Sequence, residues 1–221
     1  MTQDKIFLKK EGDAWFLRNK EELGCAKYDR PSRLAKSLNK EKIKSIAELG
    51  CSNGWRLHYL GREFQVSRLV GVDASKKAIT DGKKRYPELD LRQGLLHAVP
   101  LSEAFDLVIV NFVFHWVDRT TLARSVAEVD RVVNDGGYLI IGDFLPRVRQ
   151  KRRYHHLPEK AVYTYKQDYA RIFESLGIYK EIRRMIYNHD DPKARLGPYA
   201  SSKQAVSTIL KKSYAGYYRE G

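Results

Sequence analysis

Three kinds of feature are scarce in this sequence, and each scarcity excludes a class of protein. Cysteine occurs twice, at Cys25 and Cys51, which is too few for a disulfide framework, and no Cys/His group has the spacing of zinc ligands. No apolar run approaches the roughly 18 residues that cross a bilayer, and the first residues lack a signal-peptide pattern. We therefore expect a cytoplasmic protein without a metal site or a membrane association.

Length and composition are those of one ordinary globular domain. The 221 residues are 43% hydrophobic and 31% charged, enough for one α/β core and cramped for two. The net charge of +14 is unevenly spread, because residues 147–221 hold 17 Lys/Arg against 7 Asp/Glu, whereas residues 47–146 hold 12 against 13. A basic surface outside the central part would attract anionic partners.

The stretch from Lys44 to Trp55 organises the chain. An apolar run containing Glu48 leads into a turn marked by Gly50 and Gly54, and glycines let a ligand approach the main chain closely. A helix beginning near Trp55 would direct its first free N–H groups at that ligand. The spacing differs from the G-x-G-x-x-G of dinucleotide sites, and a carboxylate two residues before the first glycine suits a cationic ligand better than a phosphate.

The motif Glu48-x-Gly50-x-Ser52-x-Gly54 resembles the first motif of the class I S-adenosylmethionine-dependent methyltransferases. Ser52 stands where many members have glycine. The resemblance implies that Glu48 lies near the amino group of the cofactor's methionine part, and that Gly50 and Ser52 belong to the cofactor cradle. The structural alternative is a Gly-rich turn that holds no ligand.

A second acid closes the β-rich run 68–73. Asp73 comes 19 residues after the last glycine of the motif, where nucleotide folds place an acid that accepts hydrogen bonds from both ribose hydroxyls. We therefore assign Asp73, with its neighbour Ala74, to cofactor binding. Capping of the next helix is the alternative, for which Ser75 is the better candidate.

Residues 93–101 resemble the adenine-contacting turn of the same family. Many relatives have an Asp where this chain has Leu95. Leu95 and Leu96 are therefore expected to supply an apolar wall and a backbone N–H to the adenine. His97 is expected to be an exposed loop histidine.

The apolar run 106–111 predicts a parallel strand buried on both faces, and ligands gather beyond the carboxyl ends of such strands. Asn111 and Phe112 are expected to face the methionine part of the cofactor, whose sulfonium suits an aromatic face. His115 and Trp116 are candidates for the substrate side. Packing against the next helix is the alternative for the aromatic residues.

The order of the elements predicts a doubly wound, Rossmann-like α/β fold. Strands are expected at 44–49, 68–73, 89–93, 106–111 and 137–144, with helices at 76–85 and 120–133 and a final antiparallel pair at 179–187 and 205–210. The resemblance implies a seven-stranded sheet of order 3-2-1-4-5-7-6. We assign residues 1–221 to one domain, made of an N-terminal helical lid (1–40), a cofactor-binding core (41–145), and a substrate loop with the C-terminal strand pair (146–221).

The N-terminal segment is expected to form two short helices that cover the cofactor, as the resemblance implies. Trp15 would line this cover, and Arg18 would contact the cofactor carboxylate. Core packing and a solvated charge are the respective alternatives.

The most basic segment follows Pro146. Residues 147–164 show no strong periodicity, which predicts a functional loop at the substrate side. Thr164 and Gln167 fit a capping box that would open a helix over 165–176.

The reaction that the resemblance implies is methyl transfer from S-adenosylmethionine to an O, N or other nucleophile. Positioning and desolvation supply most of the catalysis, but a hydroxyl acceptor also needs a base. His115, His155 and His156 are the candidates, since an unperturbed imidazole titrates near pH 6.5. A structural role is the alternative for each.

A polar small molecule, anionic or a saccharide intermediate, is the leading acceptor. Residues 15–19 faintly resemble methylases of sugar biosynthesis, and the absence of an Asn-Pro-Pro-Tyr sequence argues against an exocyclic base nitrogen or a glutamine amide. RNA or protein methylation, suggested by the basic end, is not favoured because no RNA-binding module is recognisable. Noncatalytic cofactor binding is a further alternative, and the sequence does not indicate the oligomeric state.

Overall fold

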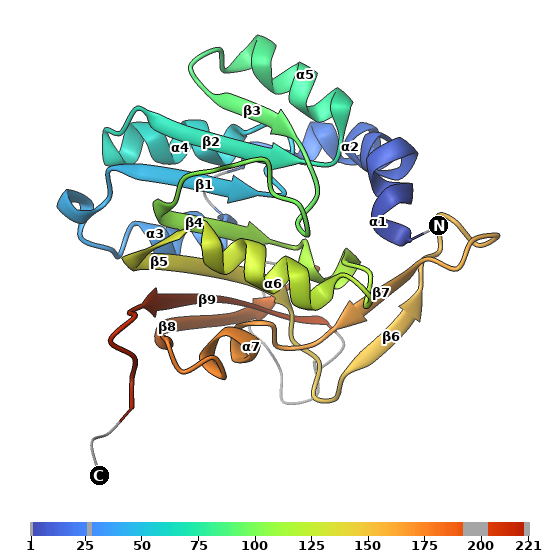
Figure 1. Ribbon diagram of the computed structural model, residues 1–221. Helices are drawn as coiled ribbons and strands as arrows, with labels where there is room; N and C mark the ends of the chain where they lie inside the picture. The colour runs from blue at the N-terminus through green and yellow to red at the C-terminus, as the bar shows by residue number, and fades with distance from the viewer. Residues whose placement is uncertain (1, 26–27, 192–202, 219–221) are drawn as a thin grey trace.

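Seven strands form one sheet at the centre of the chain, in the order β3-β2-β1-β4-β5-β9-β8 (Figure 1). The computed structural model describes residues 2–25, 28–191 and 203–218. The strands of this sheet are β1 Ser45–Leu49, β2 Arg68–Asp73, β3 Asp90–Gln93, β4 Phe105–Asn111, β5 Val133–Phe144, β8 Tyr179–Asn188 and β9 Gln204–Lys212.

Strands β1 to β5 are parallel to their neighbours, whereas β9 is antiparallel to both β5 and β8. The expected strand order, including the antiparallel end, is therefore confirmed. The segment between the last two strands includes residues 192–202, which lie outside the described residues.

Helical segments precede the sheet and cover both of its faces. They are α1 Gln3–Ile6, η1 Phe7–Glu11, α2 Gly12–Asn19, η2 Lys20–Glu22, α3 Arg30–Ala35, η4 Lys40–Lys42, α4 Trp55–Phe64, α5 Lys76–Arg85, η5 Phe114–Trp116, α6 Leu122–Arg131 and α7 Ala170–Glu174. The predicted helix 76–85 is confirmed, and the Ser75 hydroxyl caps it by accepting from the backbone N of Ala78 at 3.0 Å. None of the helices in the described ranges is long and apolar enough to span a membrane.

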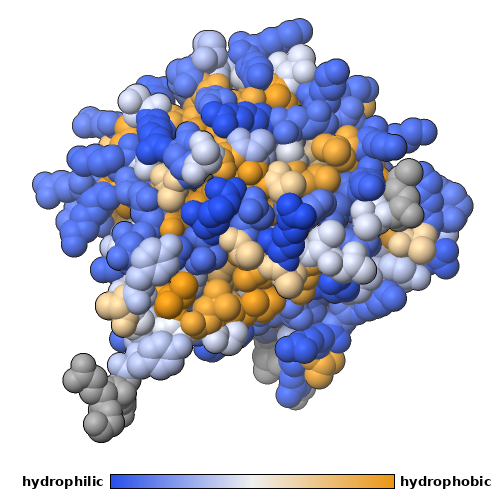
Figure 2. Space-filling model, viewed as in Figure 1, coloured by the Kyte–Doolittle hydropathy of each residue, from blue (hydrophilic) through white to orange (hydrophobic). Residues whose placement is uncertain are grey.

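Two apolar clusters hold the layers together, one on each face of the sheet. Residues of α3, α4 and α5 pack with Ile46 and Leu107 on one face, and residues of α6 and α7 pack with Ala47 and Val108 on the other. The alternation between faces follows the two-residue period of a strand, and burial on both faces explains the unbroken apolar run of β4. Hydrophilic side chains cover most of the face shown in Figure 2, with smaller apolar groups between them.

The basic segment after Pro146 differs from the prediction. Strand β6 (Gln150–Arg153) pairs antiparallel with β7 (Tyr163–Lys166), so a two-stranded hairpin replaces much of the expected irregular loop. Of the helix predicted over 165–176, only Ala170–Glu174 (α7) forms, and Thr164 lies in β7, opposite Arg152. A Tyr-Thr-Tyr run favours a strand once a partner is available, and the capping-box spacing carries no information about that partner.

The N-terminal segment is more helical than expected. A nearly continuous helical run from α1 to α2 lies at the end of the sheet toward which β1, β2 and β4 point (Figure 1). The buried Gln3 side chain fixes this run, because its amide donates to the backbone O of Trp116 and to that of Tyr163, the latter at 3.0 Å. The run is thereby joined to η5, which follows β4, and to the hairpin.

Candidate active site

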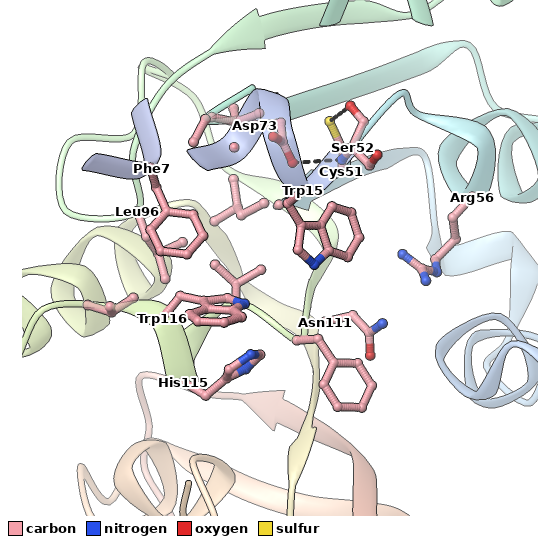
Figure 3. A pocket seen from close by; sticks show the side chains of 18 of the residues that line it. Phe7, Trp15, Cys51, Ser52, Arg56, Asp73, Leu96, Asn111, His115 and Trp116 are labelled. Carbon is pink, nitrogen blue, oxygen red and sulfur yellow. Dashed lines mark hydrogen bonds between the residues drawn. The ribbon is translucent and has the colours of Figure 1, made fainter. Parts of the chain in front are cut away.

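A cavity of about 670 Å³ lies between the N-terminal helical run and the carboxyl ends of β1, β2 and β4. Its volume is in the range of sites that hold small molecules. Figure 3 shows Asp73 and Ser52 at one side of the cavity and His115 at the other, with Trp15 and Trp116 between them. The residues that sequence reasoning assigned to the site and that line the cavity are Trp15, Gly50, Ser52, Asp73, Ala74, Leu95, Leu96, Asn111, Phe112 and His115.

The turn after β1 brings its main chain to the cavity. The backbone N atoms of Gly50 and Cys51 both donate to the carbonyl of Val72, at 2.7 and 3.1 Å, which ties the turn to β2. Gly50 has a φ of +83°, and a Cβ atom there would lie 2.1 Å from Cγ2 of Val113. Glycine is therefore required by both backbone conformation and space.

Asp73 connects this turn to the start of α5. Its Oδ2 accepts from the backbone N of Ser52 and its Oδ1 from the backbone N of Ser75, both at 2.8 Å. Burial raises the pKa of Asp73. Each carboxylate oxygen keeps a second lone pair, and within the described residues the buried hydroxyl of Ser52 has no hydrogen-bond partner. These groups fit a ligand that brings adjacent hydroxyls, as a ribose does.

Glu48 does not line the cavity, although its expected role was contact with the cofactor. It is fully buried and pairs with Arg56, whose guanidinium also donates to both carboxylate oxygens of Asp29 at 2.9 and 2.8 Å. Burial raises the pKa of Glu48 to about 7, although the positive charge of Arg56 opposes the shift. Arg56 and Asp29 do line the cavity, so Glu48 acts on it through Arg56.

The turn expected to contact adenine lies along the same cavity. Leu95 and Leu96 line it, and Leu96 is buried. The expectation of an exposed loop residue is wrong for His97, because its side chain is 20% exposed, lines the cavity, and has its Nδ1 3.2 Å from Oδ2 of Asp4. Asp4 belongs to the N-terminal helical run, which no local sequence signal connects to this turn.

The side of the cavity opposite Asp73 holds a buried histidine and carboxylate. His115 Nδ1 lies 3.0 Å from Oδ1 of Asp143, at an angle outside hydrogen-bond geometry. The backbone N of His115 donates to Oδ2 of the same carboxylate at 3.1 Å. Asp143 is the next-to-last residue of β5 and is 1% exposed, so a carboxylate is held beside an imidazole at the cavity wall.

Two lining residues on this side were missed by sequence reasoning, Phe144 and His189. They lie 45 positions apart in the sequence, yet their ring centroids are 4.9 Å apart. The antiparallel pairing of β8 and β9 beside β5 brings them together. No local pattern marks His189, which follows the last residue of β8.

Besides Glu48, three further predicted site residues are not among those that line the cavity. Arg18 pairs with Glu11 at 2.5 Å and donates to the Tyr154 hydroxyl at 2.8 Å. His155 and His156 are exposed just beyond β6, with their rings against that of Tyr154. No group of three His, Cys, Asp or Glu side chains in the described ranges is arranged to hold a metal ion.

Comparison with known proteins agrees with this geometry. Residues 47–141 match the methyltransferase domain family. Malonyl-[acyl-carrier protein] O-methyltransferase of Halalkalibacterium halodurans is 25% identical over 48% of this chain and 41% of its own length. Trans-aconitate 2-methyltransferase of Afipia carboxidovorans is 27% identical over 51% of this chain and 43% of its own. The chain thus spans about two fifths of the length of these curated relatives.

A solved structure extends the likeness over nearly the whole chain. The N-methyltransferase NodS from Bradyrhizobium japonicum, in complex with S-adenosyl-L-homocysteine, has a TM-score of 0.61 at 17% identity and covers 95% of this chain and 96% of its own. The sheet order and the glycine turn define a Rossmann-like methyltransferase fold. Over residues 47–141 the chain matches the methyltransferase domain model, and its sequence and fold resemble those of the class I S-adenosylmethionine-dependent methyltransferases. The domain match and the S-adenosyl-L-homocysteine in the NodS structure support S-adenosylmethionine as the cofactor.

Proposed function

We propose that this protein transfers the methyl group of S-adenosylmethionine to an O or N atom of a polar, anionic small molecule. The observation that carries the proposal is the continuity of one cavity, which joins the Asp73 turn to the His115–Asp143 pair. Such an arrangement lets a cofactor and a second molecule meet in one partly enclosed space, where positioning and desolvation promote transfer.

The cofactor assignments follow the lining residues. Asp73 would accept the ribose hydroxyls, Leu95 and Leu96 would pack against the adenine, and Trp15 would cover it. Asn111 and Phe112 would face the methionine part, whose positively charged sulfur makes the attached methyl group electrophilic.

Arg56 would lie at the methionine end of the cofactor. Figure 3 shows its guanidinium directed toward the cavity from α4, and the carboxylates of Asp29 and Glu48 fix its position. This supports Arg56, in place of Arg18, as the cation nearest the cofactor carboxylate, because Arg18 pairs with Glu11 outside the lining.

His115 is the preferred candidate for the general base. It lines the cavity and has Asp143 beside it, and a carboxylate stabilises the imidazolium that forms when His115 takes a proton from the acceptor. The exposed His155 and His156 remain candidates of lower rank.

The names of the relatives support an anionic small acceptor. One relative is named for a malonyl group on an acyl-carrier protein and another for trans-aconitate, and both the malonyl group and trans-aconitate carry carboxylates. A second candidate, methylation of RNA or protein, is favoured by the exposed cations of β6, namely Lys151, Arg152 and Arg153. These side chains lie outside the cavity lining. They therefore support RNA or protein methylation less strongly than the cavity supports a small-molecule acceptor.

The test is incorporation of radiolabelled methyl groups from S-adenosylmethionine into fractionated cell extract. We expect label in the small-metabolite fraction, retained on an anion exchanger, and little with the Asp73→Asn variant. The matched control is His58→Gln, whose residue lies on α4 away from the lining. Label mainly in RNA or protein would favour the second candidate, and cofactor binding without label in any fraction would indicate a noncatalytic protein.

A further inference from the structure

Three rings form a compact group on the acceptor side of the cavity. The ring centroids of Phe112, Phe144 and His189 lie 4.8 to 5.1 Å from one another, and all three residues line the cavity. Phe112 is held with a φ of +54° at the end of β4, a backbone conformation that few residues of its type adopt. The backbone of Phe112 is therefore locally strained, and this conformation directs its ring into the group.

Lys166 is not itself among the residues that line the cavity, but it places a cation against this group from a separate element. Its Nζ lies 3.5 Å from the centroid of the Phe144 ring, and Lys166 is the last residue of β7 in the hairpin. Burial lowers the pKa of Lys166 and the nearby charge of Arg152 lowers it further, against the opposing charges of Asp143 and Asp190. The ammonium therefore lacks part of the hydration that an exposed lysine has.

The neighbouring carboxylates are already engaged with other groups. Asp143 accepts from the backbone N of His115 at 3.1 Å and from that of Phe144 at 2.8 Å. Asp190 pairs with Lys203 at 3.4 Å. Within the described part of the chain, Lys166 itself makes no ion pair. A partly buried cation without its own carboxylate is a place where a ligand's negative charge is stabilised.

Resting on the proposed function, we propose that Phe112, Phe144, His189 and Lys166 form the acceptor subsite, and that it takes a planar molecule carrying a carboxylate or another ionised oxygen. The rings supply flat apolar contact, which favours a planar molecule. Ring faces carry negative potential and would repel an anion, so the Lys166 ammonium decides the charge that the subsite accepts.

His189 complements this charge selection. Burial lowers the pKa of His189, and the Lys166 charge acts in the same direction, against the opposing effect of Asp190. A neutral imidazole can donate a hydrogen bond to an anionic oxygen without adding a second positive charge. The attacking atom of the acceptor would then face His115, whose ring centroid is 5.0 Å from that of Phe144.

The experiment uses benzoate and benzamide as probes, because the two molecules have the same shape and differ in charge. Binding of each to the full-length protein saturated with S-adenosylhomocysteine is measured by calorimetry. We expect wild type to prefer benzoate. Lys166→Met should weaken benzoate binding about tenfold, the loss of one charge-assisted contact, and leave benzamide binding unchanged. Lys166→Arg, which keeps the charge, should retain the preference.

Lys151→Met is the matched control, because Lys151 lies on the same hairpin with its Nζ 4.0 Å from the Tyr163 centroid. It should bind both probes as wild type does. Equal binding of benzoate and benzamide by wild type, or an unchanged preference in Lys166→Met, would overturn the acceptor assignment. Affinity for S-adenosylhomocysteine is measured first in every variant. If wild type does not bind S-adenosylhomocysteine, the result contradicts the proposed function instead. If Lys166→Met still binds S-adenosylhomocysteine, this variant is folded.

Discussion

The hydroxyl of Tyr154 donates a 2.7 Å hydrogen bond to the carboxylate of Glu11, although 143 positions separate the two residues. Glu11 is buried, and Arg18 pairs with the same carboxylate oxygen at 2.5 Å. Burial, together with the negative charge of Glu11, raises the pKa of Tyr154. The Tyr154 ring also contacts Trp116 at a centroid distance of 4.6 Å. The N-terminal helical run is thereby fastened to the hairpin beside the cavity.

Replacing Tyr154 with Phe should loosen this attachment. The buried Glu11 carboxylate would lose one donor, which costs about 1 to 2 kcal/mol in the free energy of unfolding. Urea unfolding measures the loss, and amide hydrogen exchange should show faster opening of residues 3–19. Tyr163→Phe is the control, because within the described residues the Tyr163 hydroxyl makes no hydrogen bond. Equal stability of the two variants would show that the contact contributes nothing.

The buried acid Glu48 should make stability depend on pH. Its pKa is raised by burial from 4.5 to about 7, so between these values the folded protein holds a proton that the unfolded chain releases. The contribution of Glu48 is therefore complete below pH 4.5 and is lost as the pH rises through 7. It amounts to roughly 3 kcal/mol at most.

The variant Glu48→Gln lacks this titration. We expect the free energy of unfolding of wild type to fall relative to that of the variant as the pH rises from 4.5 to 7, measured by urea unfolding at a series of pH values. The pKa of Asp29 is lowered from 3.8, so the titration of Asp29 changes the stability only at pH values below the range of this test. Glu41→Gln, at an exposed acid, should leave the pH dependence as it is in wild type. Parallel curves for wild type and Glu48→Gln would contradict the prediction.

The parts of the fold that sequence alone predicted are those fixed by local patterns. The apolar run of β4 and the Ser75 cap of α5 depend on residues close in sequence, and the structure confirms both elements. The β6–β7 hairpin was missed because strand pairing depends on a partner, and Tyr163 to Lys166 carries no signal that chooses Gln150 to Arg153.

The same limit applies to the site. Spacing from the glycine turn marks Asp73 in the sequence. His189 comes to the cavity, and Lys166 to the ring of Phe144, only through the pairing of distant strands. Arg18 carries a charge whose nearest partner, Glu11, is seven positions away. Sequence spacing alone does not indicate whether such a charge meets a ligand or another side chain.

Asp73→Asn should lower affinity for S-adenosylhomocysteine by about tenfold or more, the cost of one or two lost contacts to a charged group. The amide would also turn an N–H₂ group toward one of the two backbone N–H donors, of Ser52 or Ser75, that the carboxylate now accepts from. Calorimetry measures the affinity and circular dichroism the fold. Asp90→Asn is the control, since Asp90 is exposed and pairs with Arg92. Unchanged affinity in Asp73→Asn would exclude the ribose assignment.

His115→Gln should depress the turnover rate by about a hundredfold if the acceptor loses a proton during transfer, because that is the usual contribution of a general base. Affinity for S-adenosylhomocysteine should stay near the wild-type value. The double variant His155→Gln, His156→Gln should lower the rate less, since both rings are exposed and lie against Tyr154 outside the lining. Turnover is measured on the acceptor purified from the labelled extract fraction. A larger loss of turnover in the double variant would assign the general base to His155 or His156 beside the hairpin. Full activity in both variants would indicate an acceptor that is already ionised when it binds.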